Sequence, residues 1–233
     1  MSKIFSIVIP VYNEEESIRD LVDEILFNIP TAKYNYEIII IDDCSKDSTQ
    51  LILEKLSNEF SIIYSSNKKN MGQSFSIREG VKLSNSDVII TLDGDGQNNP
   101  VDILKLFKMY SDNNNLKLVG GLRKNRKDSI IKIYSSKFAN FVRQFVFNDN
   151  CEDTGCSLKV FDKKIFLSFP FFTGLHRFLP TFFKSYGHET SYISVDHRKR
   201  IKGVSKYGVL NRLFKGIIDI FRVLLIIKQI KKQ

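Results

Sequence analysis

The feature that most constrains the fold is a regular alternation of short apolar runs with amphipathic segments over the first 121 residues. The runs are rich in isoleucine and valine, which is typical of buried β-strands. The segments between them repeat apolar residues every three or four positions, as one face of a helix does. This alternation predicts an α/β domain with a doubly wound, mostly parallel sheet. The expected strands are residues 5–10, 36–41, 61–65, 88–92 and 116–119, and the expected helices are residues 18–26, 50–60, 74–83 and 100–110.

Acidic residues follow two of these strands, where ligands of doubly wound sheets gather. Asp42-Asp43 comes after the second strand and Asp93-Gly94-Asp95 after the fourth. Helix capping is the alternative role for Asp42-Asp43, but Asp47-Ser48 already offers cap chemistry, so we favour ligand contact. The sequence lacks a G-x-G-x-x-G fingerprint after the first strand and a G-x-x-x-x-G-K-[ST] phosphate loop. This argues against hydride transfer and ATP hydrolysis.

The D-x-D sequence of Asp93 and Asp95 places two carboxylates on one short loop. Their oxygens can share Mg²⁺ or Mn²⁺ with a diphosphate, and Gln97 can add a neutral oxygen ligand. Such a cation offsets the charge that develops on a leaving diphosphate. The alternative interpretation is an Asp-Gly turn that only caps the next helix.

After Gly121 the chain changes character. A basic stretch, residues 129–147, is expected to be helical, and strands are expected at residues 157–161 and 190–195. Between these strands lies an aromatic-rich segment that we interpret mainly as core. It contains Phe166, Phe169, Phe171, Phe172, Phe178, Phe182 and Phe183.

Several motifs resemble, in order and spacing, those of inverting family 2 glycosyltransferases with the GT-A fold. The glutamine after the D-x-D resembles dolichol-phosphate mannosyltransferases and their bacterial polyprenyl-phosphate relatives. The resemblance runs from Phe5 to about Arg222. The motifs are IPVYNE (9–14), IDDCS (41–45), NMG (70–72), LDGDGQ (92–97), DTGCSLK (153–159), HRFLP (176–180) and HRKRIKGVSKYG (197–208).

The resemblance implies roles for individual residues. Residues that would hold the nucleotide sugar, a GDP- or UDP-sugar, are Pro10, Tyr12, Glu14, Asp42 and Asp93. The metal ligands would be Asp93, Asp95 and Gln97, and the acceptor phosphate would be bound by Arg123, Ser136, Arg200 and Lys206. Residues 1–208 then form the glycosyltransferase domain, with a nucleotide-sugar half (1–121) and an acceptor half (122–208), and residues 209–233 form an amphipathic membrane-interface helix.

The implied activity is transfer of a sugar, with inversion, to a polyprenyl phosphate such as dolichyl or undecaprenyl phosphate, for cell-envelope glycan or lipid glycosylation. The sequence departs from the family at Cys44, where glycine is usual. It also lacks the transmembrane helices that many relatives carry after the catalytic domain.

The acceptor decides how much acid–base chemistry is needed. A phosphate monoester is already ionised at neutral pH, so positioning and leaving-group stabilisation would suffice, with Asp93, Asp95 and Arg200 as the central residues. A glycan hydroxyl is the alternative acceptor, and it needs a carboxylate base. Asp153 is the candidate base, although it can equally anchor the turn before the next strand. His176 and His197 are weaker candidates, because a lone histidine beside aromatic residues is more often structural.

A third interpretation is a catalytically idle nucleotide-binding membrane scaffold. The D-x-D with Gln97, together with Arg200 and Lys206, argues against it, because a scaffold has no need of all these residues.

The C-terminal 36 residues, 198–233, contain 11 lysines and arginines and one acidic residue, whereas the rest of the chain has 24 basic and 25 acidic residues. Interleaved apolar residues favour an anionic membrane surface over nucleic acid as the partner. The helical spacing places Leu210, Leu213, Phe214, Ile217, Ile218, Phe221, Leu224 and Leu225 opposite Arg212, Lys215, Asp219, Arg222 and Lys228. No apolar run approaches the roughly 18 to 20 residues that span a bilayer. We therefore expect an interfacial helix on the cytoplasmic face of the membrane.

The competing role for this helix is docking on a separate membrane protein or on a second copy of the chain. The three cysteines, Cys44, Cys151 and Cys156, follow no signal peptide, so we expect free thiols in a reducing cytosol.

Overall fold

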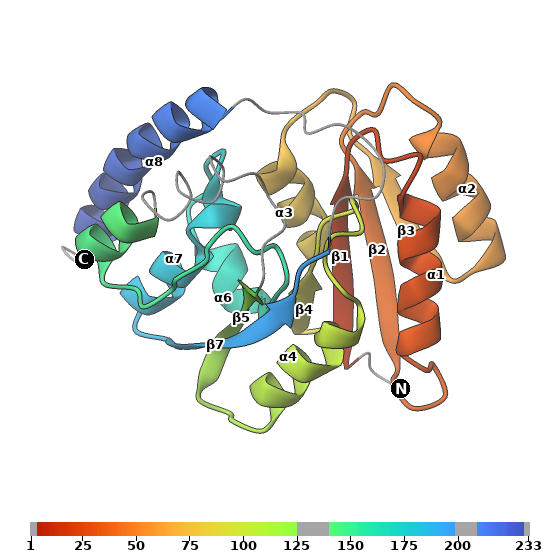
Figure 1. Ribbon diagram of the computed structural model, residues 1–233, viewed down its shortest axis with the longest axis horizontal. Coiled ribbons are helices and arrows are strands. Elements are labelled where there is room, and N and C mark those ends of the chain that lie inside the picture. Colours follow the sequence, from red (N-terminus) through yellow and green to blue (C-terminus); the bar gives the residue numbers. More distant parts are fainter. Residues whose placement is uncertain (1–3, 125–139, 199–208, 231–233) are drawn as a thin grey trace.

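A computed structural model describes residues 4–124, 140–198 and 209–230 of the chain (Figure 1). Its centre is a seven-stranded sheet in the order β3-β2-β1-β4-β6-β5-β7. Among the paired strands only β6 runs antiparallel to its neighbours, so the expected doubly wound, mostly parallel sheet is confirmed. The strands are β1 (Phe5–Val11), β2 (Tyr36–Asp42), β3 (Ile62–Ser66), β4 (Val88–Thr91), β5 (Leu116–Lys124), β6 (Lys159–Asp162) and β7 (Glu189–Asp196).

Helices cover both faces of the sheet. Helices α1 (Ile18–Asn28), α2 (Thr49–Glu59) and α4 (Val101–Ser111) share one apolar cluster with the side chains of Ile7 and Ile9. Val8, between them in the strand, points to the opposite cluster, because successive strand residues face opposite sides. That second cluster takes its side chains from α3 (Gln73–Leu83), α6 (Lys163–Ser168), the 3₁₀ helix η1 (Leu175–Arg177), α7 (Leu179–Ser185) and α8 (Val209–Ile230).

The strand sequences explain the burial of the sheet. Every residue of β1 and of β2 is buried, which is typical of strands covered on both faces. Their carboxyl ends lie at the same edge as the end of β4, since β1 pairs in parallel with both neighbours. Strand order reverses at β1, with β2 on one side and β4 on the other, so ligand binding is expected at this edge.

The aromatic-rich segment is largely core, as the sequence indicates. Phe166, Phe169, Phe182 and Phe183 are at most 1% exposed, and Phe169 contacts the rings of several others. Phe171 is the exception at 42% exposure, with its ring over the Arg78 guanidinium.

Two predicted helices in the C-terminal half differ in detail. Of the basic helix expected at residues 129–147, the structure describes residues 140–147, and these are helical. In α8 the prediction for Asp219 was wrong. Asp219 was expected among the outward polar residues, but it is 5% exposed and forms an ion pair with Arg177, with an N···O distance of 2.7 Å. The reason is that Arg177, 42 residues earlier, supplies a partner that helical periodicity alone does not reveal.

Candidate active site

The D-x-D loop leaves β4 and is fixed by groups from distant parts of the chain. The backbone N–H of Asp93 donates to Ser157 Oγ at 3.2 Å, and Gln73 Nε2 donates to Asp93 Oδ1 at 2.7 Å. Gly94 lies so close to β1 that a Cβ there would sit 2.6 Å from Val11 Cγ1. The glycine is therefore required by close packing of the two strand ends.

The chain after β7 is bonded to the same loop. The backbone N–H of Arg198 donates to the carbonyl oxygen of Gln97 at 2.9 Å, and Gln97 Nε2 donates back to the Arg198 carbonyl at 3.2 Å. The Gln97 amide nitrogen also lies 3.4 Å from His197 Nε2. The chain thus passes beside the D-x-D loop two residues before Arg200. Arg200, Lys206 and Ser136, three of the predicted acceptor-phosphate residues, lie outside the described residues.

Charges around Asp93 act in opposite directions. Burial raises the pKa of the Asp93 carboxyl above its ordinary value, and the Glu14 carboxylate adds to the rise. A hydrogen bond from Ser157 and the positive charges of Lys159 and Arg123 lower the pKa and oppose this shift. At a partly buried carboxylate beside a second acid, a bound cation would reduce the electrostatic repulsion.

The residues of this loop fit a hard divalent cation. Asp93 and Asp95 offer carboxylate oxygens and Gln97 an amide oxygen, the ligand type that Mg²⁺ and Mn²⁺ prefer. In the described ranges, no group of three or more His, Cys, Asp or Glu side chains is placed to hold a metal. In general, Mg²⁺ is bound through one or two protein carboxylates, with substrate phosphates and water completing its coordination.

Loops after β1 and β2 interlock beside the D-x-D loop. The Asn13 side chain accepts a 2.7 Å bond from the Lys46 backbone N–H, and the Asn13 N–H donates to Ser45 Oγ at 2.8 Å. Ser17 Oγ donates to the carbonyl oxygen of Gly94 at 2.9 Å, and it lies 3.2 Å from a Glu14 carboxylate oxygen. Glu14 and half-buried Tyr12 therefore border the same strand ends as the D-x-D loop, while Pro10 is buried within β1.

The two aspartates after β2 have different partners. The Asp42 carboxylate accepts hydrogen bonds from the backbone N–H and the hydroxyl of Ser45, and it is 1% exposed. The Asp43 carboxylate accepts from the backbone N–H groups of Met71 and Gly72 at 2.8 and 2.7 Å. Asp43 therefore holds the loop before α3, and helix capping is left to Asp47, which accepts from Thr49 N–H.

The backbone at Cys44 accounts for the glycine that is usual at this position in the family. Its φ angle is +64°, in the left-handed region that glycine adopts without penalty. The chain thus keeps the backbone conformation that the usual glycine would have. All three cysteines are free thiols, as expected, and burial raises the pKa of both Cys151 and Cys156 to about 11.

Arg123 and Asp153 form one unit at the end of β5. Arg123 Nε and Nη2 donate to the two oxygens of Asp153 at 2.7 and 2.8 Å, and both side chains are 11% exposed. A fork-to-fork pair of this kind fixes the orientation of the guanidinium. The structure therefore pairs the predicted acceptor-binding arginine with the predicted general base.

His176 is held as a neutral ring. The Ser74 hydroxyl oxygen accepts from the Gly174 N–H at 3.0 Å and lies 2.6 Å from His176 Nδ1, a hydrogen bond whose donor is set by the tautomer of the ring. Burial, aided by the charges of Arg177 and Lys159, lowers the pKa of His176 to about 3. The contacts of His176 tie η1 to the start of α3, which is the structural role that the sequence favoured.

Three residues at the site were missed by sequence reasoning: Gln73, Ser157 and Lys159. Gln73 directly follows the NMG motif and Ser157 lies within the DTGCSLK motif, so their positions in motifs were available clues. Lys159 is 3% exposed and donates to the carbonyl oxygens of Thr154 and Cys156. It places a buried positive charge beneath the loop that carries Asp153 and Ser157.

Comparison with known proteins places this site in a family. Residues 6–169 match the family described as Glycosyl transferase family 2. The chain belongs to glycosyl transferase family 2. It is 30% identical over 224 residues to a dodecaprenyl-phosphate galacturonate synthase of Rhizobium johnstonii, covering 94% of this chain and 66% of that protein. It is 34% identical over 211 residues to an undecaprenyl-phosphate 4-deoxy-4-formamido-L-arabinose transferase of Aeromonas hydrophila, covering 90% of this chain and 64% of that one.

The chain thus spans slightly less than two thirds of the length of these two relatives. Solved structures support the GT-A fold. Mannosyl-3-phosphoglycerate synthase of Rubrobacter xylanophilus superposes with a TM-score of 0.74 at 13% identity, covering 99% of this chain and 76% of that one. Glucosyl-3-phosphoglycerate synthase of Mycobacterium tuberculosis, in complex with Mn²⁺, UDP and phosphoglyceric acid, gives 0.71 at 13% identity, covering 94% and 78%.

Proposed function

We propose that this chain transfers a sugar from a nucleoside diphosphate sugar to a polyprenyl phosphate, with inversion at the anomeric carbon. The observation that carries the proposal is a pair of contacts of the D-x-D loop. The loop bonds to Ser157, four residues after Asp153 of the Arg123–Asp153 pair, and to Arg198 at the start of the basic segment after β7. Relatives of 30 to 34% identity act on dodecaprenyl or undecaprenyl phosphate, according to their names, which supports a polyprenyl acceptor.

The donor would lie across the ends of β1, β2 and β4. Tyr12, Glu14 and Asp42 border the place for the nucleoside, and Pro10 shapes the end of β1. Asp93, Asp95 and Gln97 would hold Mg²⁺ or Mn²⁺. This cation would neutralise charge on the leaving diphosphate. One neighbour of the same fold, glucosyl-3-phosphoglycerate synthase of Mycobacterium tuberculosis, was crystallised with UDP and Mn²⁺ and also with UDP and Mg²⁺, which supports a divalent metal here.

The reaction needs little proton transfer. A phosphate oxygen of the acceptor attacks the anomeric carbon, the bond from that carbon to the diphosphate oxygen breaks, and the nucleoside diphosphate leaves. Arg123, held by Asp153, presents positive charge close to Asp93, and we assign Ser136, Arg200 and Lys206 to the same phosphate. The enzyme then contributes mainly orientation and charge stabilisation.

A glycan hydroxyl acceptor is less well supported. Such an acceptor needs a base, and Asp153 was the candidate. Both of its carboxylate oxygens accept bonds from the Arg123 guanidinium, so Asp153 is better suited to position that arginine.

We further propose that the protein works at the cytoplasmic face of a membrane, with residues 209–233 as the interfacial segment. Among the described residues, no helix is both long and apolar enough to cross a bilayer. The outward face of α8 carries exposed Ile218, Phe221 and Leu225, as expected of a helix that lies on lipid. Docking on a membrane protein or a second copy of the chain remains the competing role of this segment.

The decisive experiment is product analysis. The protein is incubated with undecaprenyl phosphate and a panel of UDP- and GDP-sugars, and the lipid fraction is analysed by mass spectrometry. The expected product is a lipid heavier by one sugar, formed with Mg²⁺ or Mn²⁺ and absent in excess chelator. Sugar transfer to a glycan hydroxyl, with none to the lipid phosphate, would overturn the proposal.

A single substitution tests whether the basic segment binds the lipid acceptor or the nucleotide donor. Arg200→Ala should raise the apparent KM for polyprenyl phosphate by about tenfold or more, because it removes a charge-assisted bond to phosphate. Nucleotide affinity, measured by titration of the variant with UDP or GDP, should change little. Equal losses for both substrates would show that the basic segment binds the donor.

A further inference from the structure

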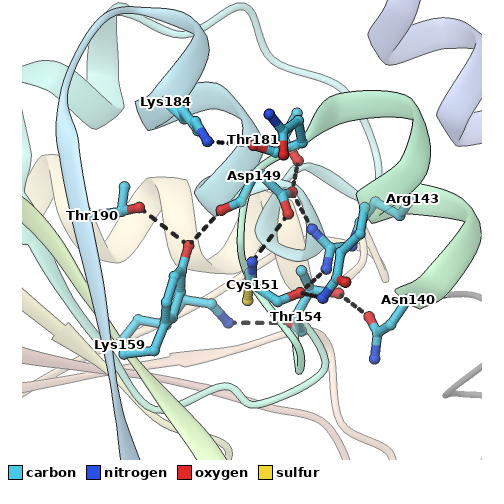
Figure 2. Close-up of polar contacts among 12 residues, drawn as sticks. Asn140, Arg143, Asp149, Cys151, Thr154, Lys159, Thr181, Lys184 and Thr190 are labelled. Carbon is cyan, nitrogen blue, oxygen red and sulfur yellow. Dashed lines mark hydrogen bonds and ion pairs between the residues drawn. The ribbon is translucent and has the colours of Figure 1, made fainter.

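The helix formed by residues 140–147 buries a charged side chain and shows two large apolar side chains to the outside. On its inward side, Asn140, Arg143 and Gln144 make hydrogen bonds to the body of the protein (Figure 2), and Phe147 packs against the core cluster. Its outward side carries Phe141 and Phe145, which are 67% and 85% exposed. Surface helices normally turn apolar side chains inward, so this orientation calls for a function outside the domain.

The orientation is fixed by buried charge. Arg143 is 3% exposed, and its guanidinium bonds to the Asp149 carboxylate and the Cys151 carbonyl oxygen. Asp149 is fully buried and is also held by the hydroxyl of Thr181 and the N–H of Cys151 (Figure 2). Apolar side chains would hold the helix at least as firmly, because burying an ion pair carries a desolvation cost. The polar anchor instead fixes one rotation of the helix, with both phenylalanines outward.

The exposed phenylalanines are not isolated. Helix α8, on the same side of the molecule in Figure 1, shows an outward row of Ile218, Phe221 and Leu225, which are 57%, 65% and 65% exposed. Its inward Val223 belongs to the same apolar cluster as Phe178, which contacts the Phe147 ring at 6.2 Å. Both helices therefore rest on one core cluster while showing apolar side chains to the outside.

The charges of α8 indicate its partner. Arg222 and Lys228 on this helix are exposed. In the sequence, residues 198–233 carry a net charge of +10, from 11 basic residues and one acidic residue. A surface that combines exposed aromatic side chains with excess positive charge fits the headgroup region of an anionic bilayer.

We infer that Phe141 and Phe145 insert into the interfacial region of an anionic membrane, as a second contact beside α8. This inference rests on the proposed function for its choice of a lipid surface. It also links that surface to the site, because Thr154 Oγ1 donates to Asn140 Oδ1 at 3.1 Å and Thr154 directly follows Asp153 (Figure 2). Insertion would therefore set the height of the Arg123–Asp153 pair above the lipid phosphates.

The absence of tryptophan from the chain makes this directly testable. Phe145→Trp introduces a single reporter, and its emission should shift to the blue and be quenched by brominated lipids when vesicles of phosphatidylcholine and phosphatidylglycerol are added. Phe27→Trp is the matched control, because Phe27 on α1 is 86% exposed but lies outside the proposed surface. An unchanged Phe145→Trp spectrum on vesicles that bind the protein would overturn the inference.

A second measurement uses flotation. Phe141→Ser with Phe145→Ser should lower binding to the anionic vesicles by about tenfold or more, whereas Phe27→Ser should not. Circular dichroism melting checks that each variant is folded. Wild-type flotation by the folded double variant would contradict the inference, as would a change from dimer to monomer in sedimentation, which would assign the surface to a second copy. Neither readout requires sugar transfer, so failure of the proposed activity would be seen separately.

Discussion

Two buried carboxylates, one in each half of the molecule, hold loops by different chemistry. Asp43, in the N-terminal half (residues 4–121), accepts bonds from the backbone N–H groups of Met71 and Gly72 and from the Asn67 amide. Asp149, in the C-terminal half (residues 122–230), is bonded to the Arg143 guanidinium and the Thr181 hydroxyl. The first needs only neutral donors, whereas the second buries a full ion pair.

The same contrast holds for the helices. In the N-terminal half, α1 buries Ile18, Leu21, Val22 and Ile25 against the sheet and follows the usual amphipathic rule. In the C-terminal half, residues 140–147 and α8 also bury apolar side chains such as Val223, but they place the charged Arg143 and Asp219 inside as well and show large apolar side chains outside. This contrast is in keeping with our proposals that the N-terminal half binds a polar donor and that the C-terminal half contacts an apolar partner.

The largest expected effect lies in the N-terminal half. Asp95→Asn should lower turnover by about 10³-fold or more, because it weakens the site for the cation that offsets leaving-group charge. Initial rates at saturating donor, with and without chelator, measure this. Asp112→Asn, at the exposed end of α4, is the matched control. Full activity of wild type in excess chelator would contradict the metal assignment.

The next largest effect is expected on the free energy of unfolding, when Asp149 or Asp43 is substituted. Asp149→Asn should destabilise the fold by about 3 to 5 kcal/mol, because it removes the carboxylate that compensates the buried Arg143 charge. Asp43→Asn removes bonds from neutral donors only and should cost about 1.5 to 3 kcal/mol. Urea unfolding of both variants gives the comparison. Equal losses would remove the proposed difference between the halves, and Arg143→Met combined with Asp149→Leu should recover part of the larger loss.

Much of the N-terminal half could be predicted from sequence because its information is local. Buried strands appear as apolar runs, helices as periodic ones, and the acidic residues of the site follow strands directly, as at Asp93. The partners of these groups are not local. Gln73 reaches Asp93 across 20 residues, and Asp43 binds Met71 across 28. No pattern in the sequence specifies such pairs until the strands are placed side by side.

The C-terminal half was harder for the same reason. Helical spacing identified the apolar residues of α8, but apolar residues lie on most of its sides, so periodicity did not settle which side packs inward. Asp219 was placed outside because a charged residue is normally solvated. Its burial depends on Arg177, and the orientation of residues 140–147 depends on Asp149, which lies beyond the end of that helix.

A pH effect should follow from His176, which joins the two halves through Ser74. Its pKa in the folded protein, about 3, lies below the ordinary value of 6.5, so the unfolded chain binds the proton more readily. The contribution to stability is therefore complete above about pH 6.5 and is lost as pH falls toward 3. Between pH 7 and pH 5 the loss amounts to about 2 kcal/mol.

Urea unfolding at both pH values tests this, with His176→Gln expected to remove the corresponding part of the pH dependence. His188→Gln, whose ring lies beside Phe183, is the control. An identical pH dependence in wild type and His176→Gln would show that folding does not change the pKa of His176.

The smallest effect tests whether the N-terminal half positions its metal ligands through neutral groups. Gln73 opens α3 and donates to Asp93 Oδ1 at 2.7 Å, which orients the carboxylate. Gln73→Ala should weaken Mn²⁺ affinity by about tenfold, since loss of a hydrogen bond to a metal ligand has effects of that size. Electron paramagnetic resonance titration of Mn²⁺ with bound nucleoside diphosphate measures the affinity, and substitution of the exposed Gln50 on α2, Gln50→Ala, is the control. If Gln73 acts through Asp93, saturating Mn²⁺ restores turnover. A loss of turnover that persists at saturating metal, with unchanged Mn²⁺ affinity, would instead make Gln73 a direct contact of the donor sugar.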